Sequence, residues 1–88
     1  MSIPQYQSHT LVRAFKIRRI VRELAGDFVI SPEDPGLSPI IVSESWLRTH
    51  NVREGGYYVL HTDGMVTYMP ALDFESSYTR LFNIGMEG

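Results

Sequence analysis

The apolar residues between positions 11 and 24 fit two secondary structures at once. Ile17, Ile20 and Leu24 recur at the three-to-four spacing of a helix, with arginines between them. Most of the apolar residues in this segment are nevertheless β-branched or aromatic, which favours a strand. The hydrophobic pattern alone therefore leaves residues 12–24 open between a helix and a strand, and Gly26 ends the segment in both cases.

The middle of the chain predicts short elements. Residues 27–31 (DFVIS) and 40–42 (IIV) are typical of brief strands, and the three prolines and one glycine of residues 31–39 indicate a loop between them. Ser43 fits the N-cap of a helix over residues 44–50, because its hydroxyl can accept a hydrogen bond from a main-chain N–H of the first turn. Asn51 fits the end of this helix.

The segment from Gly55 to Tyr78 has the most distinct pattern. Asp63-Gly64 between two β-prone runs predicts a hairpin with a two-residue turn, since a type I′ turn needs positive φ at both central residues. Such a turn places these pairs opposite each other: His61 and Val66, Leu60 and Thr67, Val59 and Tyr68, Tyr58 and Met69. The two predicted faces are Tyr57, Val59, His61, Val66 and Tyr68 on one side, and Tyr58, Leu60, Met65 and Met69 on the other. Both faces are largely apolar, so either helices cover both or one is left for a partner.

Pro70 predicts the start of a second helix over residues 70–80, because the missing N–H of proline costs nothing in a first helical turn. Phe74 and Tyr78 share the buried side of this helix. The elements together predict one α+β domain over residues 11–82, with an antiparallel sheet of four to five strands and two short helices. Residues 1–10 and 83–88 are expected to be flexible termini.

Composition narrows the class of protein. The chain has 88 residues, of which 43% are hydrophobic, and this content argues against disorder. There is no cysteine, which excludes disulfides and thiolate metal sites. We expect a cytoplasmic protein, because no apolar run is long enough for a membrane span and the N-terminus lacks a signal pattern.

Catalytic chemistry has little support in the sequence. His9, His50 and His61 are not at the spacing of metal ligands, and no serine stands in a context that would activate it as a nucleophile. We therefore expect no enzyme activity, no metal and no cofactor.

The charges are unevenly distributed. The net charge is −2, yet residues 1–22 hold five basic residues and no acid. This asymmetry raises the hypothesis of a single-stranded nucleic-acid-binding module in which arginines contact phosphates and sheet tyrosines stack on bases. Its candidate residues are Arg18, Arg19, Arg22, Tyr57, Tyr58 and Tyr68. The acidic excess of residues 23–88 counts against it, since phosphate approach to the tyrosines is then unfavourable.

Several short motifs lie towards the two ends of the chain: PQYQSH at residues 4–9, VRAFKI at 12–17, GGYYV at 55–59, Asp63-Gly64, Pro70-Ala71, Phe74-Glu75 and Tyr78-Thr79-Arg80. Together they resemble a family of small phage and prophage proteins without an established activity. The chain departs from the family pattern at Met65, where the family tends to have an aromatic residue, and at Met69, where it tends to have a serine. The resemblance implies a strand for residues 12–21 and a location in the host bacterial cytoplasm.

The sequence thus predicts a phage or prophage accessory protein that acts by binding to a host or phage protein or to itself as a homodimer. Trp46 joins the tyrosines and arginines named above as a candidate binding residue, because this composition is typical of interfaces. The alternatives are the nucleic-acid module and a host-defence antagonist that sequesters a small molecule. A structural role in the virion ranks lower because the chain is short.

Overall fold

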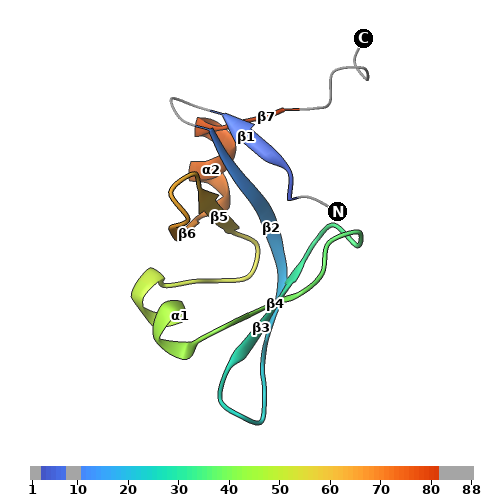
Figure 1. Ribbon diagram of the computed structural model, residues 1–88, viewed down its shortest axis with the longest axis vertical. Coiled ribbons are helices and arrows are strands. Elements are labelled where there is room, and N and C mark those ends of the chain that lie inside the picture. Colours follow the sequence, from blue (N-terminus) through green and yellow to red (C-terminus); the bar gives the residue numbers. More distant parts are fainter. Residues whose placement is uncertain (1–2, 8–10, 82–88) are drawn as a thin grey trace.

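The structure is a computed structural model that describes residues 3–7 and 11–81. This part of the chain folds into antiparallel strands and two short helices, which confirms the α+β class (Figure 1). The elements are β1 (Gln5–Gln7), β2 (Leu11–Arg22), β3 (Phe28–Pro32), β4 (Ile40–Val42), α1 (Glu44–His50), β5 (Tyr57–His61), β6 (Val66–Met69), α2 (Ala71–Ser77) and β7 (Thr79–Leu81). Neither helix is long and apolar enough to cross a membrane.

The five strands expected from the sequence are present, and two three-residue strands add to them. One of these, β1, lies inside the segment 1–10 that was expected to be a flexible terminus. The other, β7, begins at Thr79, so that α2 ends at Ser77 and does not continue to residue 80. The two added strands pair with each other, with Gln5 opposite Leu81, and such long-range pairing of short segments leaves no local sequence signal. The expected flexible tail, residues 83–88, lies outside the described residues.

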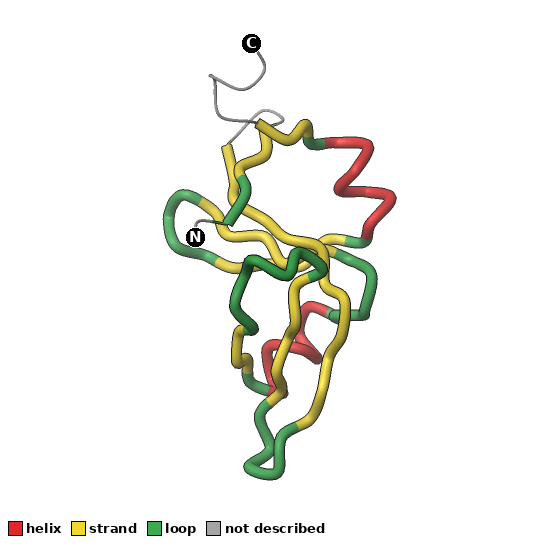
Figure 2. Tube along the Cα trace, turned by 90° about the vertical axis from the view of Figure 1, so that its right-hand side faces the viewer, coloured by secondary structure: helices red, strands yellow, loops and turns green. Residues whose placement is uncertain are grey.

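The long strand β2 organises the sheet. Its first half pairs with β1 and with β5, and its second half pairs with β3. The result is a five-stranded sheet in the order β7-β1-β2-β5-β6 that shares β2 with a three-stranded sheet, β2-β3-β4. We call the second part, residues 17–32 and 40–42, the arm. Figures 1 and 2 show the β2–β3 turn of the arm at one end of the molecule, whose longest extent is 46 Å.

A β-bulge in β2 explains the ambiguous hydrophobic pattern of this segment. Ile17 pairs with Pro32 and Arg19 with Ser31, so Arg18 is an additional residue on the β2 side. Both Ile17 and Ile20 consequently pack in the same core cluster, while Arg18 and Arg19 are both exposed. The bulge thus produces a helix-like spacing of three in a strand.

Two hydrophobic clusters form the core, one on each side of the five-stranded sheet. The cluster under α2 contains Val12, Ala14, Tyr57, Val59 and Phe74. The cluster on the side of α1 contains Phe15, Ile17, Ile30, Leu37 and Tyr58, with Trp46 packed against it. Burial of a side chain such as Phe74, which is fully buried, stabilises the fold by about 2–3 kcal/mol. Each face of the hairpin therefore packs against one helix, α2 through Phe74 and α1 through Trp46.

The hairpin register differs from the prediction by one residue. The turn has three residues, Thr62 to Gly64, with hydrogen bonds from the Gly64 N–H to the His61 carbonyl and from the His61 N–H to the Met65 carbonyl. Gly64 has φ +91°, the left-handed conformation that closes a three-residue hairpin with a bulge. The observed pairs are Tyr57 with Met69, Tyr58 with Tyr68, Val59 with Thr67 and Leu60 with Val66. A one-residue shift turns each β6 side chain to the other face, so Val66 and Tyr68 lie with Tyr58 and Leu60.

The first helix begins and ends where the sequence predicts. The Ser43 hydroxyl accepts a hydrogen bond from the Trp46 N–H at 3.2 Å. Asn51 adopts φ 51° and its N–H bonds to carbonyls of the last turn. Caps of this kind typically contribute about 1 kcal/mol, which helps a helix of only seven residues to hold Trp46 in place.

Candidate functional site

Tyr57 is a packing residue that fastens α2 to the sheet. Its ring is buried and stacks on Phe74, with 4.1 Å between the ring centroids. Its hydroxyl donates a hydrogen bond to Glu75 Oε2 at 2.9 Å, and Lys16 Nζ lies 3.6 Å from the same oxygen. Burial, together with the neighbouring Glu75 carboxylate, raises the pKa of Tyr57 above its usual value. Tyr57 therefore presents no ring face to a partner.

Tyr58, Tyr68 and Trp46 belong to the layer on the α1 side. Tyr58 is buried and stacks on Phe15 at 4.8 Å, and this burial raises its pKa. Trp46 lies 5.8 Å from Tyr58 between ring centroids and is half-buried. Tyr68 is half-buried too, and its ring occupies the space that a side chain at Gly56 would need. Burial thus removes the main stacking surface that the nucleic-acid hypothesis requires.

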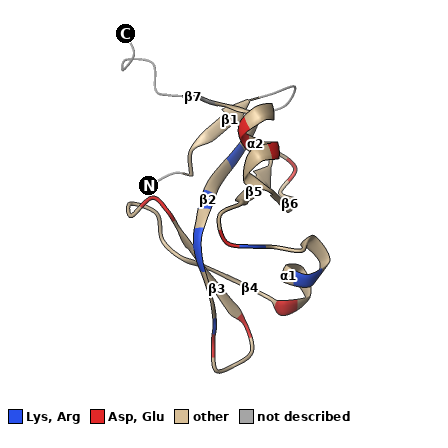
Figure 3. Cartoon of the chain, turned by 180° about the vertical axis from the view of Figure 1, so that it is seen from behind, with Lys and Arg blue, Asp and Glu red and all other residues tan. Residues whose placement is uncertain are grey.

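The three candidate arginines lie on the arm, away from the tyrosines. Arg18 and Arg19 are exposed on the side of β2 opposite the cluster that contains Tyr58. Arg22 is exposed, and its guanidinium lies 5.7 Å above the Phe28 ring. Within the described part of the chain none of the three forms an ion pair. Figure 3 shows the basic residues distributed along β2. The seven residues proposed from the sequence therefore do not form one site.

The structure adds an exposed apolar row that the pattern of the sequence does not predict. Val21 pairs with Val29, and Val29 pairs with Ile41, so that the three side chains cross the arm from β2 to β4. Val21 is 44% exposed and Ile41 is 68% exposed, while Val29 is half-buried. Once the bulge is known, strand alternation places Arg19 and Val21 on the same outer face. We call Arg18, Arg19, Val21, Val29 and Ile41 the outer patch.

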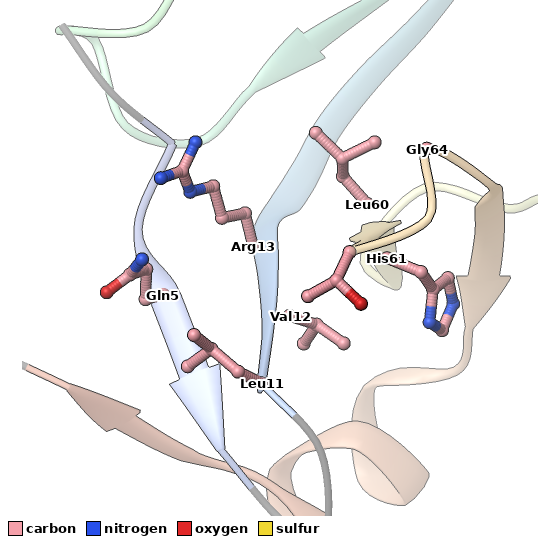
Figure 4. A pocket seen from close by; sticks show the side chains of 8 residues that line it. Gln5, Leu11, Val12, Arg13, Leu60, His61 and Gly64 are labelled. Atoms are coloured by element: carbon pink, nitrogen blue, oxygen red, sulfur yellow. The ribbon is translucent and has the colours of Figure 1, made fainter.

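A second surface feature is a half-open groove of about 390 Å³ at the other end of β2 (Figure 4). Gln5, Arg13 and Leu60 stand in one row across β1, β2 and β5 on its wall. On the other side lies His61, whose Nε2 is 2.8 Å from the Thr67 hydroxyl. The described residues contain no group of three His, Asp or Glu side chains that could hold a metal ion. The groove can offer an amide, a cation and apolar contact, but no paired acid and base.

Comparisons with known proteins connect this fold with a phage protein. No protein-family model matches the chain, and no curated protein matches it. Among solved structures, it is similar to the solution NMR structure of the monomeric form of the phage L decoration protein, with a TM-score of 0.69 and 25% sequence identity. The similarity covers 89% of this chain and 59% of that chain, so the present chain spans about three fifths of the length of the decoration protein that it matches.

Proposed function

We propose that this chain is a non-catalytic phage protein that decorates the virion by binding to the outer surface of its capsid. The observation that carries the proposal is the similarity to the phage L decoration protein, which extends over 89% of the chain at 25% identity. Membership in the small phage family with the PQYQSH and GGYYV motifs is part of the same proposal.

A role in the virion, which the sequence alone ranks below binding to a host protein because the chain is short, is the function that the structural similarity favours. Shortness is a weak argument, since a fold of the same size forms the greater part of a decoration protein.

Single-stranded nucleic acid is the second candidate, because Arg18, Arg19 and Arg22 are exposed and form no ion pair in the described part. It ranks lower, since Tyr57 and Tyr58 are buried and base stacking normally supplies much of such binding. Among the described residues, no observed contact specifically favours binding to a host protein, self-association or capture of a small molecule.

Co-sedimentation tests the proposal. Particles of the phage or induced prophage that carries the gene are prepared from a deletion strain, so that their surface lacks this protein. Purified protein is added and the particles are pelleted. We expect saturable pelleting with the particles and none without them. Protein that stays in the supernatant at micromolar concentration, with intact particles in the pellet, would overturn the proposal.

A further inference from the structure

The β-bulge places two positive charges next to each other on the outer face of the arm. Because Arg18 is an additional residue, Arg18 and Arg19 are both exposed on the outer face. Neither forms an ion pair within the described residues, although the chain outside residues 1–22 is acidic. Two adjacent guanidinium groups are therefore available for carboxylates of another molecule, which they can bind with two hydrogen bonds each.

The exposed apolar row lies directly beside these arginines. Val21, Val29 and Ile41 are cross-strand neighbours, and β4, which carries Ile41, pairs only with β3 in the described part. At the end of the arm the side chain of Leu24 is fully exposed. Arginine next to exposed β-branched residues is a composition that favours a protein interface, in which the apolar centre is desolvated and the charges fix the orientation.

Large exposed apolar side chains elsewhere on the described surface stand singly. Leu11 lies at the start of β2, Met65 between the hairpin turn and β6, and Leu72 on α2. Isolated residues of this kind are normal on soluble proteins, whereas a contiguous row next to charges marks an interaction site. On the described surface, the arm brings three such side chains, Val21, Leu24 and Ile41, together with arginines that form no ion pair, whereas Leu11 is the single one beside Arg13.

We infer that the outer patch (Arg18, Arg19, Val21, Val29 and Ile41) is the surface that docks onto the capsid, at a place where carboxylates surround apolar side chains of the shell protein. The inference rests on the proposed function and adds the surface and the chemistry of its partner. A nucleic acid fits the patch less well, because the apolar row offers no aromatic ring for bases and the turn of the arm carries Glu23 and Asp27.

The test uses the deletion-strain particles and two pairs of variants. Arg18→Glu/Arg19→Glu reverses both charges of the patch, and Arg48→Glu/Arg53→Glu makes the same change in net charge at two exposed residues outside the patch. Ile41→Asp places a charge in the apolar row. Leu72→Asp is its control, because it places the same charge on α2, where the side chain of Leu72 is more exposed than that of Ile41. Circular dichroism and melting temperature confirm that each variant folds. We expect the two patch variants to bind particles roughly tenfold or more weakly, and both controls to bind like the wild type.

The outcomes separate the inference from the proposed function. If the wild-type protein binds particles and folded patch variants bind equally well, the docking surface is elsewhere while the decoration function stands. If the wild-type protein does not bind particles, both fail. Two further results would overturn the capsid as the partner of the patch. One is binding of the wild-type protein to free single-stranded DNA, if Arg18→Glu/Arg19→Glu abolishes that binding. The other is self-association, measured by light scattering, that the patch variants abolish.

Discussion

The indole Nε1 of Trp46 donates a hydrogen bond to the main-chain carbonyl of Val66 at 3.2 Å. Val66 begins β6, an edge strand that pairs only with β5 in the described part. The open side of an edge strand carries unpaired main-chain groups, and the indole satisfies one of them. α1 is thereby tied to the hairpin across 20 residues of sequence, next to the ring of Tyr58.

Replacing this donor tests its contribution to stability. Trp46→Phe keeps an aromatic ring but leaves the Val66 carbonyl without its partner, so we expect a loss of about 1 kcal/mol in the free energy of unfolding. Urea denaturation followed by circular dichroism measures this change, because Trp46 is the only tryptophan and its fluorescence disappears with it. An unchanged free energy of unfolding would show that the bond is not maintained in solution.

The hydroxyl of Tyr57 gives a second prediction. Tyr57→Phe removes the hydrogen bond to Glu75, and we expect the free energy of unfolding at neutral pH to fall by about 1 kcal/mol. Ser76→Ala serves as a control on the exposed side of α2, where only hydrogen bonds to carbonyls of the same helix are lost. Equal effects of the two substitutions would contradict a specific role of the Tyr57–Glu75 contact.

The same residue predicts a dependence of stability on alkaline pH. Burial and Glu75 raise the pKa of Tyr57 in the folded state, so the neutral phenol is favoured there. The unfolded chain begins to lose this proton near pH 10, while the folded protein holds it, and stability present below pH 10 is lost as the pH rises further. Wild-type stability should therefore decline more steeply above pH 10 than that of Tyr57→Phe. Parallel urea midpoints of the two proteins between pH 9 and 11 would rule this out.

A glycine is required at position 56 because a neighbouring side chain leaves no room for a Cβ, and not because of the main-chain conformation. A Cβ at this position would collide with the ring of Tyr68. The three described glycines that do have positive φ, Gly26, Gly55 and Gly64, have open space around them. We expect Gly56→Ala to destabilise the protein by about 1–3 kcal/mol, the usual cost of overpacking. Adding Tyr68→Ala should recover part of this loss, because the collision disappears. A double-mutant cycle in urea measures the coupling, and strict additivity would contradict the steric explanation.

The parts of the fold that local sequence determines were predictable, and those that depend on tertiary pairing were not. Ser43 and Asn51 mark α1 because capping acts within one turn. The hairpin was located by Asp63-Gly64, but its register was wrong because the same dipeptide also fits the last two positions of a three-residue turn. β1 and β7 are three-residue strands that form only by long-range pairing, β1 with β2 and β7 with β1, and Tyr57 and Tyr58 are buried by elements distant in sequence. The outer patch could not be predicted from the sequence, because the face on which Arg19 and Val21 lie depends on the bulge at Arg18.

Deletion of Arg18 tests that bulge directly. Without this residue, Ile17, Arg19 and Ile20 would pair in an uninterrupted ladder with Pro32, Ser31 and Ile30, and both isoleucines would still face the core. We therefore expect a folded protein whose free energy of unfolding falls by no more than about 1–2 kcal/mol, in the range of ordinary substitutions.

Deletion of Lys16, another basic residue of the same strand, is the matched control. It would place Phe15 or Ile17, both buried, on the wrong face, and we expect loss of cooperative unfolding. Calorimetry distinguishes the two deletions, and a Lys16 deletion as stable as the Arg18 deletion would refute the assigned register.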